Sequence, residues 1–570
     1  MVDRRLTGGM VDDKKLLFYD IEVFAKDVVI VFKNIDKVLI AVFHNDFEGI
    51  EELVENWILV GYNNYWYDDY ILTGVLNRWS NYQIKKLNDS IIGGGRVKRK
   101  LDGRIKSLDC FQQLYQSPGL KRVEGNMGLS IKESAVGFDI DRELTVDELA
   151  ETFEYCMYDV DSTVEVYKRR KYEYFVPKQG LLDMLNKPGA ERWNTTTIAT
   201  NLLVDKAVPK WSEMRGIPWD LVPGDDVRMM WEQVNEHGGE IKVKTVTRHE
   251  FGCELAFGFG GLHGVNKTVK RVKDVVLLDV ASFYPSIIIN LEALGMGTKK
   301  YVDIRDERLK AKADGDWVRS DALKLVLNSV FGLMNNQYSN LYNERANRTV
   351  CVYGQIMLYE LCRRVAPYGD IININTDGIV FLPKSVGYKK VVEGWQKEFN
   401  FQLDEKGYDL FIQRDVNNYV AVVGDEVITK GGDVARYQAD NLWSNNNARI
   451  VDIAIVEKLV NGTDVIDTIV GRIDQPYLFQ YVLQAGHTYR GVCDEGGNMV
   501  GKVNRVFAGR GGGTTCLYKL RYDDGRVRFA DAPEKMLIWN GDCGNVPGFR
   551  GLIDVDHYYQ LTLKKLERWT

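Results

Sequence analysis

The segment KLLFYDIEVF (15–24) places two acidic residues, Asp20 and Glu22, two positions apart in an otherwise apolar stretch. Its alternation predicts a β-strand, and a period of two puts both carboxylates on one face of that strand. Because like charges on one face repel each other, such a pair either binds a cation or lies exposed on an edge strand. On this segment alone, both alternatives remain open.

Two later segments supply further carboxylates. VGYNNYWYDDYIL (60–72) offers Asp68 within an aromatic cluster. EYCMYDVDSTVEVY (154–167) has helical periodicity, which puts Tyr155 and Asp159 one turn apart on the same face of a helix. The spacing therefore predicts that a strand, a loop and a helix contribute acidic side chains to one place.

Together these carboxylates could hold two hard divalent cations about 4 Å apart, the arrangement that hydrolyses phosphodiesters. The predicted metal ligands and catalytic carboxylates are Asp20, Glu22, Asp68 and Asp159. One cation would activate a water molecule, which Tyr155 would orient, and the other would stabilise the leaving 3′ oxygen.

The middle of the chain has a second pair of isolated aspartates. KDVVLLDVASFYPSIIINL (273–291) predicts a buried strand that ends at Asp279, where a carboxylate is costly unless it is paired or bound to metal. NINTDGIV (373–380) places Asp377 between two apolar runs, and its Asn, Asp and Gly residues predict a hairpin turn. On local grounds, Asp279 is a solvated strand end and Asp377 a turn residue; only their meeting would make a metal site.

Between them, DERLKAKADGDWVRSDALKLVLNSVFGLMNN (306–336) predicts two helices broken at ADGD. Arg308 and Lys312 are one turn apart on the first helix, as are Lys324 and Asn328 on the second. Two antiparallel helices that present these cations to a shared groove would bind a triphosphate. The alternative is a charged amphipathic hairpin with no ligand.

The order of these motifs resembles that of family B DNA polymerases. DIE, N-x-x-Y-D and Y-x-x-x-D are similar to the three exonuclease motifs, and DVASFYPS, KLVLNSVFG and INTDGI to the first palm, fingers and palm-hairpin motifs. The resemblance covers about residues 15 to 435 by motif. This chain departs from the family at Tyr67, where phenylalanine is usual, at Phe331, where tyrosine is usual, and at Asn375 and Gly378, which replace an aspartate and a serine.

The resemblance implies an α+β multidomain fold, with an RNase H-like exonuclease domain followed by a right-hand polymerase of palm, fingers and thumb. The expected division is 1–190 for the exonuclease domain with its N-terminal segment, 191–301 for the first part of the palm with a linker, 302–337 for the fingers, 338–440 for the second part of the palm, and 441–570 for the thumb.

The resemblance also implies template-directed DNA synthesis with 3′-5′ editing, using two Mg²⁺ ions per active site, for which Mn²⁺ can substitute. Asp279, Asp377 and the carbonyl of Val280 are the expected ligands for synthesis, and Lys324 is the expected proton donor to pyrophosphate. The expected nucleotide contacts are Ser282, Tyr284, Arg308, Lys312, Lys324, Asn328 and Phe331, of which Tyr284 excludes a 2′-OH. The expected DNA contacts are Asn64, Gly260, Gly261, Tyr419, Lys430, Arg505 and Arg510.

Bulk composition agrees with a globular enzyme. The chain has 570 residues, 45% hydrophobic and 27% charged, which is enough for several cores. A net charge of −6 argues against a protein that coats nucleic acid, although it does not exclude a nucleic-acid enzyme. The eight cysteines have no zinc spacing, so we expect reduced, buried thiols and oxygen ligands for any metal. The polar start and the lack of a long apolar run predict a cytoplasmic protein, in the host cytoplasm if the chain is viral, without membrane contact.

The expected substrates are primer–template DNA and dNTPs, and the expected partners are a helicase/primase, a single-strand-binding protein and a processivity factor. The intervals from Asp279 to Lys324 and from Gly332 to Asn375 are short. They leave little room for the insertions of protein-primed phage polymerases, so we expect a compact, phage-like enzyme that extends ordinary primers without a priming terminal protein.

Two alternatives compete with this interpretation. Asn375 would suit an RNase H-like exonuclease whose palm is degenerate and inactive. A non-catalytic DNA-binding replication scaffold is the other, and it predicts that Asp20→Ala and Asp279→Ala leave every activity unchanged. A reverse transcriptase is disfavoured because an editing domain is expected.

Overall fold

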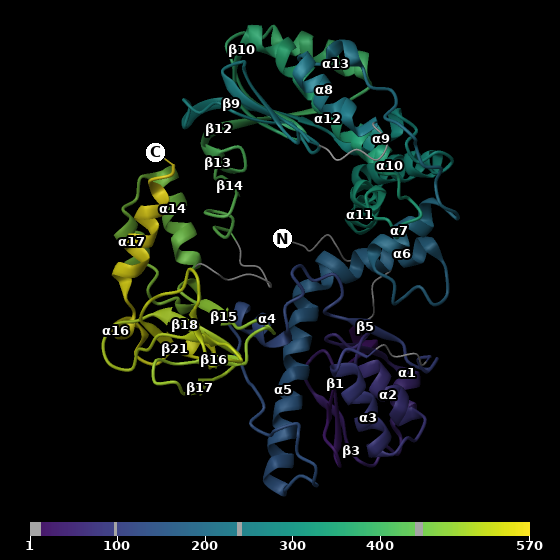
Figure 1. Ribbon diagram of the computed structural model, residues 1–570, viewed down its shortest axis with the longest axis vertical. Coiled ribbons are helices and arrows are strands. Elements are labelled where there is room, and N and C mark those ends of the chain that lie inside the picture. Colours follow the sequence, from purple (N-terminus) through teal and green to yellow (C-terminus); the bar gives the residue numbers. More distant parts are fainter. Residues whose placement is uncertain (1–12, 96–99, 236–241, 439–447, 570) are drawn as a thin grey trace.

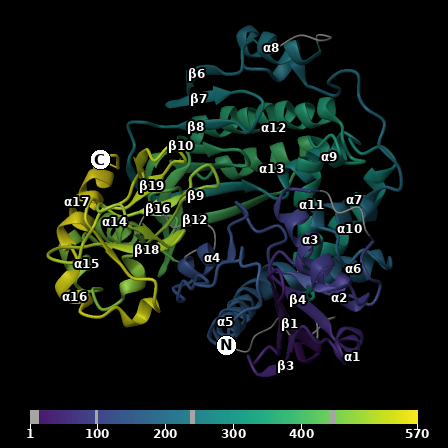
Figure 2. The same ribbon diagram turned by 60° about the horizontal axis from the view of Figure 1, so that its bottom comes forward.

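The structure is a computed structural model that describes residues 13–95, 100–235, 242–438 and 448–569. Three regions are visible: an N-terminal unit, a large middle sheet with its helices, and a C-terminal unit (Figures 1 and 2). The expected palm–thumb boundary at 440/441 lies outside the described residues. Within the described part of the chain, no helix combines the length and the apolar character needed to cross a bilayer.

The N-terminal unit is built on a mixed five-stranded sheet with the order β3-β2-β1-β4-β5. β1 runs antiparallel to β2 and parallel to β4. Its strands are β1 (Leu16–Val23), β2 (Val28–Lys33), β3 (Leu39–His44), β4 (Ile58–Gly61) and β5 (Ser107–Asp109), and its helices are α1 (Ile50–Asn56), α2 (Asp68–Leu76), α3 (Asn81–Ile92), α4 (Leu120–Asn126) and α5 (Val146–Arg170).

The alternation of β1 decides where its acidic side chains lie. Phe18 belongs to the apolar cluster that contains buried residues of α5, whereas Tyr19 belongs to the cluster on the opposite face, with α2. Asp20 and Glu22 share the parity of Phe18, so they face α5. The strand predicted for this segment is confirmed, and it lies inside the sheet rather than on an edge.

A helical connection leads from this unit toward the middle sheet (Figure 1). α5 begins with a capping box in which Thr145 and Glu148 bond each other's backbone. It continues through a π-helical turn (Lys171–Phe175) into α6 (Val176–Leu185), and α7 (Thr195–Leu203) follows. Both α6 and α7 pack against the helix Trp317–Met334, α11.

The middle region is a nine-stranded antiparallel sheet with the order β14-β13-β12-β9-β11-β10-β8-β7-β6. Its strands are β6 (Val246–Glu250), β7 (Cys253–Phe257), β8 (His263–Val265), β9 (Arg271–Val280), β10 (Gly369–Asn375), β11 (Gly378–Pro383), β12 (Leu403–Asp415), β13 (Asn418–Val423) and β14 (Glu426–Lys430). Its helices are α8 (Asp225–Glu232), α9 (Phe283–Asn290), α10 (Gly297–Ala313), α11, α12 (Glu344–Val365) and α13 (Tyr388–Phe399).

Two local predictions for this region are confirmed. Asn375 pairs with Gly378, which leaves Thr376 and Asp377 as a two-residue turn between β10 and β11. α10 ends at Ala313 and α11 begins at Trp317, so the two helices break at ADGD, where the Asp316 side chain caps α11. The expectation of a fully buried β9 is wrong: the strand is exposed over much of its first half, and Asp279 is half-buried.

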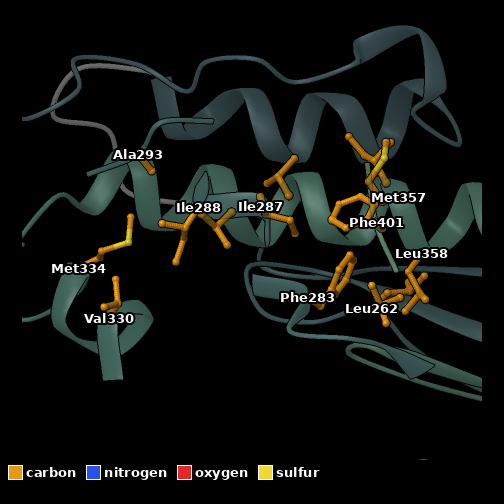
Figure 3. Packing of buried hydrophobic residues seen from close by; sticks show 14 of the residues in the cluster. Leu262, Phe283, Ile287, Ile288, Ala293, Val330, Met334, Met357, Leu358 and Phe401 are labelled. Atoms are coloured by element: carbon orange, nitrogen blue, oxygen red, sulfur yellow. The ribbon is translucent and has the colours of Figure 1, made fainter. Parts of the chain in front are cut away.

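A single large core fixes α9 beneath the sheet. Phe283 packs close to Phe401 and Met357, while Ile288 at the other end of the helix lies near Met334 of α11 (Figure 3). Burial of such side chains contributes roughly 1.5–3 kcal/mol each. The motif DVASFYPS is therefore anchored by the core immediately after its aspartate.

The C-terminal unit contains two small sheets, with the orders β15-β18-β21 and β17-β16-β19-β20. The strands are β15 (Tyr481–Gln484), β16 (Gly491–Cys493), β17 (Met499–Val500), β18 (Val503–Ala508), β19 (Tyr518–Leu520), β20 (Arg526–Arg528) and β21 (Met536–Ile538), and the helices are α14 (Arg449–Asn461), α15 (Val465–Val470), α16 (Phe549–Leu552) and α17 (Val555–Leu566). In α14, residues 450–456 are all buried because α15 and α17 both pack on it. All eight cysteines are free and buried, as expected.

Candidate active sites

The first acidic cluster is formed where β1 crosses α5. Carboxylate oxygens of Asp20, Glu22 and Asp159 lie within 4.8 Å of one another. Asp68, the first residue of α2, lines the same cavity of about 760 Å³. The structure thus brings together the four carboxylates that the sequence predicted as metal ligands.

The electrostatics of this cluster show a deficit of positive charge. Burial, followed by repulsion from Asp159, raises the pKa of Asp20 to about 7. Burial also raises the pKa of Glu22 and of Asp68, and Asp20 adds to both shifts. A carboxyl with the pKa of Asp20 is about half-protonated near neutral pH unless a cation joins it. A hard divalent ion fits this all-oxygen donor set.

A cation that the sequence analysis missed lies at this cluster. The Lys121 ammonium of α4 forms an ion pair with Asp159 and another, at 3.3 Å, with Glu124. It also lies 4.5 Å from the centre of the Tyr155 ring. Lys121 belongs to an unremarkable LKR run, so no sequence signal distinguished it from a surface lysine.

The predicted roles of Tyr155 and Asn64 agree with the structure to different degrees. Tyr155 lies beside Asp159 and Lys121, and its assigned task of orienting water stays a prediction. Asn64 was predicted to contact DNA, but its side chain is 0% exposed and donates a hydrogen bond of 3.2 Å to Asp69. That prediction is wrong for this conformation, because the side chain points into the core; Asn63 lines the cavity instead.

Asp69 explains why Asp68 is presented to the cavity. Its buried carboxylate accepts hydrogen bonds from Tyr19, from Ser107 at 2.7 Å and from Arg192. These partners come from β1, β5 and the segment before α7, so the first turn of α2 is held from three sides. The adjacent Asp68 is thereby fixed with its side chain toward Asp20.

The second candidate site lies at the turn between β10 and β11. Gly378 pairs with Asp279, and the backbone N–H of Val280 donates to the carbonyl of Asp377 at 2.8 Å. Asp279 and Asp377 are therefore neighbours across two hydrogen-bonded segments. They line one cavity of about 340 Å³ together with Val280.

The carboxyl of Asp279 has a raised pKa, for the same cause as in the first cluster. Burial raises it to about 6, with further contributions from Asp377 and Asp404, and Lys430 lowers it. Asp404 was missed by the sequence analysis; it is exposed and pairs directly with Asp279 across β12 and β9. Burial also raises the pKa of Asp377, which Lys430 again opposes.

The helical side of this cavity carries most of the predicted nucleotide contacts. The residues that line it include Ser282, Tyr284, Arg308, Lys324, Asn328 and Phe331. The rings of Tyr284 and Phe331 have their centres 4.5 Å apart. Arg308 Nε is buried and has no hydrogen-bond partner among the described residues. Lys312, in contrast, is exposed one turn further along α10 and is not among the lining residues, so its predicted phosphate contact stays a prediction.

The glycines of FGFGGLHG act on the hairpin turn. A Cβ atom on Gly261 would lie 2.8 Å from the Cα of Thr376, so only glycine lets this loop approach the turn that carries Asp377. Gly260 is exposed, and its carbonyl accepts a hydrogen bond from Gln355. The DNA contacts predicted for the two glycines stay predictions, but Gly261 already has a structural task.

The remaining predicted DNA contacts divide between the middle and C-terminal regions. Tyr419 and Lys430 pair across β13 and β14, and the charge of Lys430 reaches both Asp279 and Asp377. Arg510 is exposed. Arg505 is 0% exposed and bonds to carbonyl groups inside the protein, so the predicted DNA contact of Arg505 is wrong.

No family model matches the chain, and no curated protein matches it. Among solved structures, the chain is similar to the family B DNA polymerase from the hyperthermophilic archaeon Pyrobaculum calidifontis. The two are 13% identical, with a TM-score of 0.44, and the match covers 97% of this chain and 78% of that chain.

Proposed function

We propose that this chain is a template-directed DNA polymerase with a 3′-5′ proofreading exonuclease. The observation that carries the proposal is the middle cavity. Two carboxylates from β9 and the hairpin turn line it together with Arg308 and Lys324 from two helices. A cavity with acids beside cations suits a metal-bound nucleoside triphosphate.

Asp279, Asp377 and the Val280 carbonyl would hold two Mg²⁺ ions, for which Mn²⁺ can substitute; Asp20, Glu22, Asp68 and Asp159 would hold two more. When bound, such ions activate an attacking oxygen and stabilise charge on the leaving group. The donor sets fit: each is made of oxygen atoms, and each contains a carboxyl with a pKa raised by burial and by other acids.

In the polymerase reaction, the chain's own side chains position the nucleotide. Arg308 and Lys324 would neutralise the β and γ phosphates, and Lys324 Nζ would give its proton to the departing pyrophosphate. The Tyr284 ring, which packs on Phe331, would lie under the sugar and exclude a 2′-OH. Asn328 would pack against the new base pair.

In the exonuclease reaction, Tyr155 would orient the attacking water. Lys121 supports this task because its ammonium holds Asp159 in an ion pair and lies against the Tyr155 ring.

The proposed substrates are primer–template DNA and dNTPs. The N-terminal unit would be the RNase H-like domain, and the middle and C-terminal regions would be palm, fingers and thumb. The whole would be a compact phage-like enzyme. It would work with a helicase, a single-strand-binding protein and a processivity factor.

A labelled primer–template assay tests the proposal. With dNTPs and Mg²⁺, the wild type should extend the primer, and without dNTPs it should shorten it. Asp20→Ala should lose shortening alone, and Asp377→Ala should lose extension alone. A wild type that neither extends nor shortens the primer would refute both activities.

A second candidate, an exonuclease with an inactive palm, is favoured by one observation. The amide of Asn375 donates to the Val416 carbonyl and to Asn417, both at 3.2 Å, so residue 375 supplies no carboxylate to the site. Shortening without extension by the wild type would select this candidate.

A further inference from the structure

The C-terminal unit is docked on the segment that follows α4. Across this contact, Cys543 N donates to the Gly128 carbonyl at 2.9 Å, and Ile131 N donates to the Asn540 carbonyl at 2.7 Å. Val503 N donates to Glu133 Oε1 at 3.1 Å. Figure 1 shows α4 beside the C-terminal unit. Because backbone groups make most of these hydrogen bonds, they fix the two segments in one register.

Arg505 is the centre of this contact. Its guanidinium donates to the carbonyls of Gly125 and Leu129 in the N-terminal unit, and to Gln480 and the Gly541 carbonyl in its own unit. The side chain is 0% exposed. A buried guanidinium is costly unless its N–H groups are bonded, so separating the two units would leave this charge unsatisfied.

Packing around Gly125 makes the contact close. A Cβ atom at this position would lie 2.8 Å from Val482 Cγ1, and Ile131, Val482 and Val503 form a small apolar cluster beside it. Gly125 is the penultimate residue of α4, one turn after Lys121. α4 is therefore fixed by the C-terminal unit at one end and by the Lys121–Asp159 ion pair at the other.

The docked unit also reaches the acidic cavity directly. Lys502 precedes β18 and lines the cavity that contains Asp20 and Asp159. One other lysine among the lining residues, Lys85, already pairs with Asp89 at 2.9 Å. Lys502 is exposed and has no ion pair or hydrogen bond within the described part of the chain.

We propose that the C-terminal unit completes the exonuclease site. Lys502 binds a backbone phosphate of the DNA end at the rim of the carboxylate cavity, and Arg505 acts as a positioning residue that holds α4, and with it Lys121, in place. The inference rests on the proposed exonuclease function. Its physical basis is charge, because the phosphate of a DNA end that approaches four carboxylates is stabilised by a cation. Among the described residues that line the cavity, the lysine without an ion pair is Lys502 of the C-terminal unit.

The test measures digestion of a labelled single-stranded oligonucleotide, with extension of a primer–template as the second readout. Lys502→Ala should raise the KM for digestion about fivefold to tenfold, the size of one charge-assisted contact, with kcat nearly unchanged. Lys502→Glu should raise it further, and Lys502→Arg should restore it. The exposed Lys535 of the same unit gives the matched control, Lys535→Ala, which should digest like the wild type.

Arg505→Gln should lower kcat for digestion by more than about tenfold while extension falls less, because Lys121 is no longer held. If Arg505→Gln loses extension as well and unfolds by circular dichroism, the Lys502 series decides alone. Unchanged digestion by both Lys502→Ala and Lys502→Glu would overturn the inference and leave the exonuclease itself intact. If the wild type digests nothing while Asp377-dependent extension persists, the proposed exonuclease fails, and the inference fails with it.

Discussion

The two acidic sites differ in how much of their charge the protein itself balances. The N-terminal cluster gathers four carboxylates around one lysine, Lys121, and its members are largely buried. The middle site has two carboxylates, half-buried Asp279 in β9 and exposed Asp377 in the hairpin turn, and Arg308 and Lys324 line the same cavity. Burial is the largest cause of the raised pKa values in both.

This difference matches two chemical tasks. Hydrolysis of a phosphodiester needs a water molecule held among acids and cations, so a dense carboxylate cluster is sufficient. Synthesis must also hold a triphosphate, whose charge requires permanent cations opposite the metal ligands. The predictions below test whether the two sites are separable in this way.

The largest effects should come from removing one carboxylate charge without changing its shape. We expect Asp279→Asn to lower extension about 10³- to 10⁵-fold and to leave digestion within about twofold, because a metal ligand is lost at one site only. Glu22→Gln should do the converse. Single-turnover assays of both activities on the same preparation measure this, and a parallel loss of both activities in either variant would contradict separate sites.

The cations of the middle site should have intermediate effects. Lys324→Ala should lower kcat/KM for dNTP incorporation about 10- to 100-fold, since a contact to the triphosphate and a proton donor are both removed. Lys312→Ala is the matched control, because Lys312 lies outside the cavity, and it should change kcat/KM less than about threefold. Equal losses in the two variants would support the sequence-based prediction that both cations face one groove.

Metal binding should depend on pH because burial raises the pKa of the clustered carboxyls, so that protons compete with the metal ion at low pH. The folded pKa of Asp20, about 7, lies above its ordinary value, so the folded state binds more protons and loses stability as pH rises from about 4 through 7. Mg²⁺ should therefore raise the melting temperature by a few degrees at pH 8, in line with about 1–3 kcal/mol of binding, and by less at pH 5.

Asp20→Asn should reduce this metal-dependent gain at pH 8, because it removes one ligand and the repulsion that the metal relieves. Differential scanning calorimetry with and without millimolar Mg²⁺ measures this gain, with EDTA as the reference. A gain of equal size at pH 5 and pH 8 would show that the clusters are not protonated without metal.

The smallest effect should come from Asn375→Asp. The Asn375 amide donates to the Val416 carbonyl, which a carboxylate cannot do, so we expect a loss of about 1 kcal/mol in the free energy of unfolding. Extension should change less than about threefold, because this side chain is bonded to the turn after β12 rather than to Asp377. A large gain in extension would instead show that residue 375 reaches the metal ions.

Local sequence patterns determined the elements that carry the chemistry. The period-two alternation around Asp20 predicted β1, the Asn-Thr-Asp-Gly turn predicted the β10–β11 hairpin, and ADGD predicted the break between α10 and α11. These predictions succeed because alternation, turn chemistry and capping act over a few residues. The motif order also identified the carboxylates that the structure brings together in each cavity.

Only the tertiary structure decided which polar side chains face a cavity and which face the core. Asn64 and Arg505 carry polar groups that suit DNA, but packing against Asp69 and against the Gly125 and Leu129 carbonyls buries them. Lys121 and Asp404 have no distinctive sequence context. Lys121 lies beside Asp159, nearly forty positions away, because α4 meets α5, and Asp404 lies beside Asp279, more than a hundred positions away, because β12 pairs with β9. Such placements depend on contacts between distant segments, whereas the spacing of residues along one segment reports only its own local geometry.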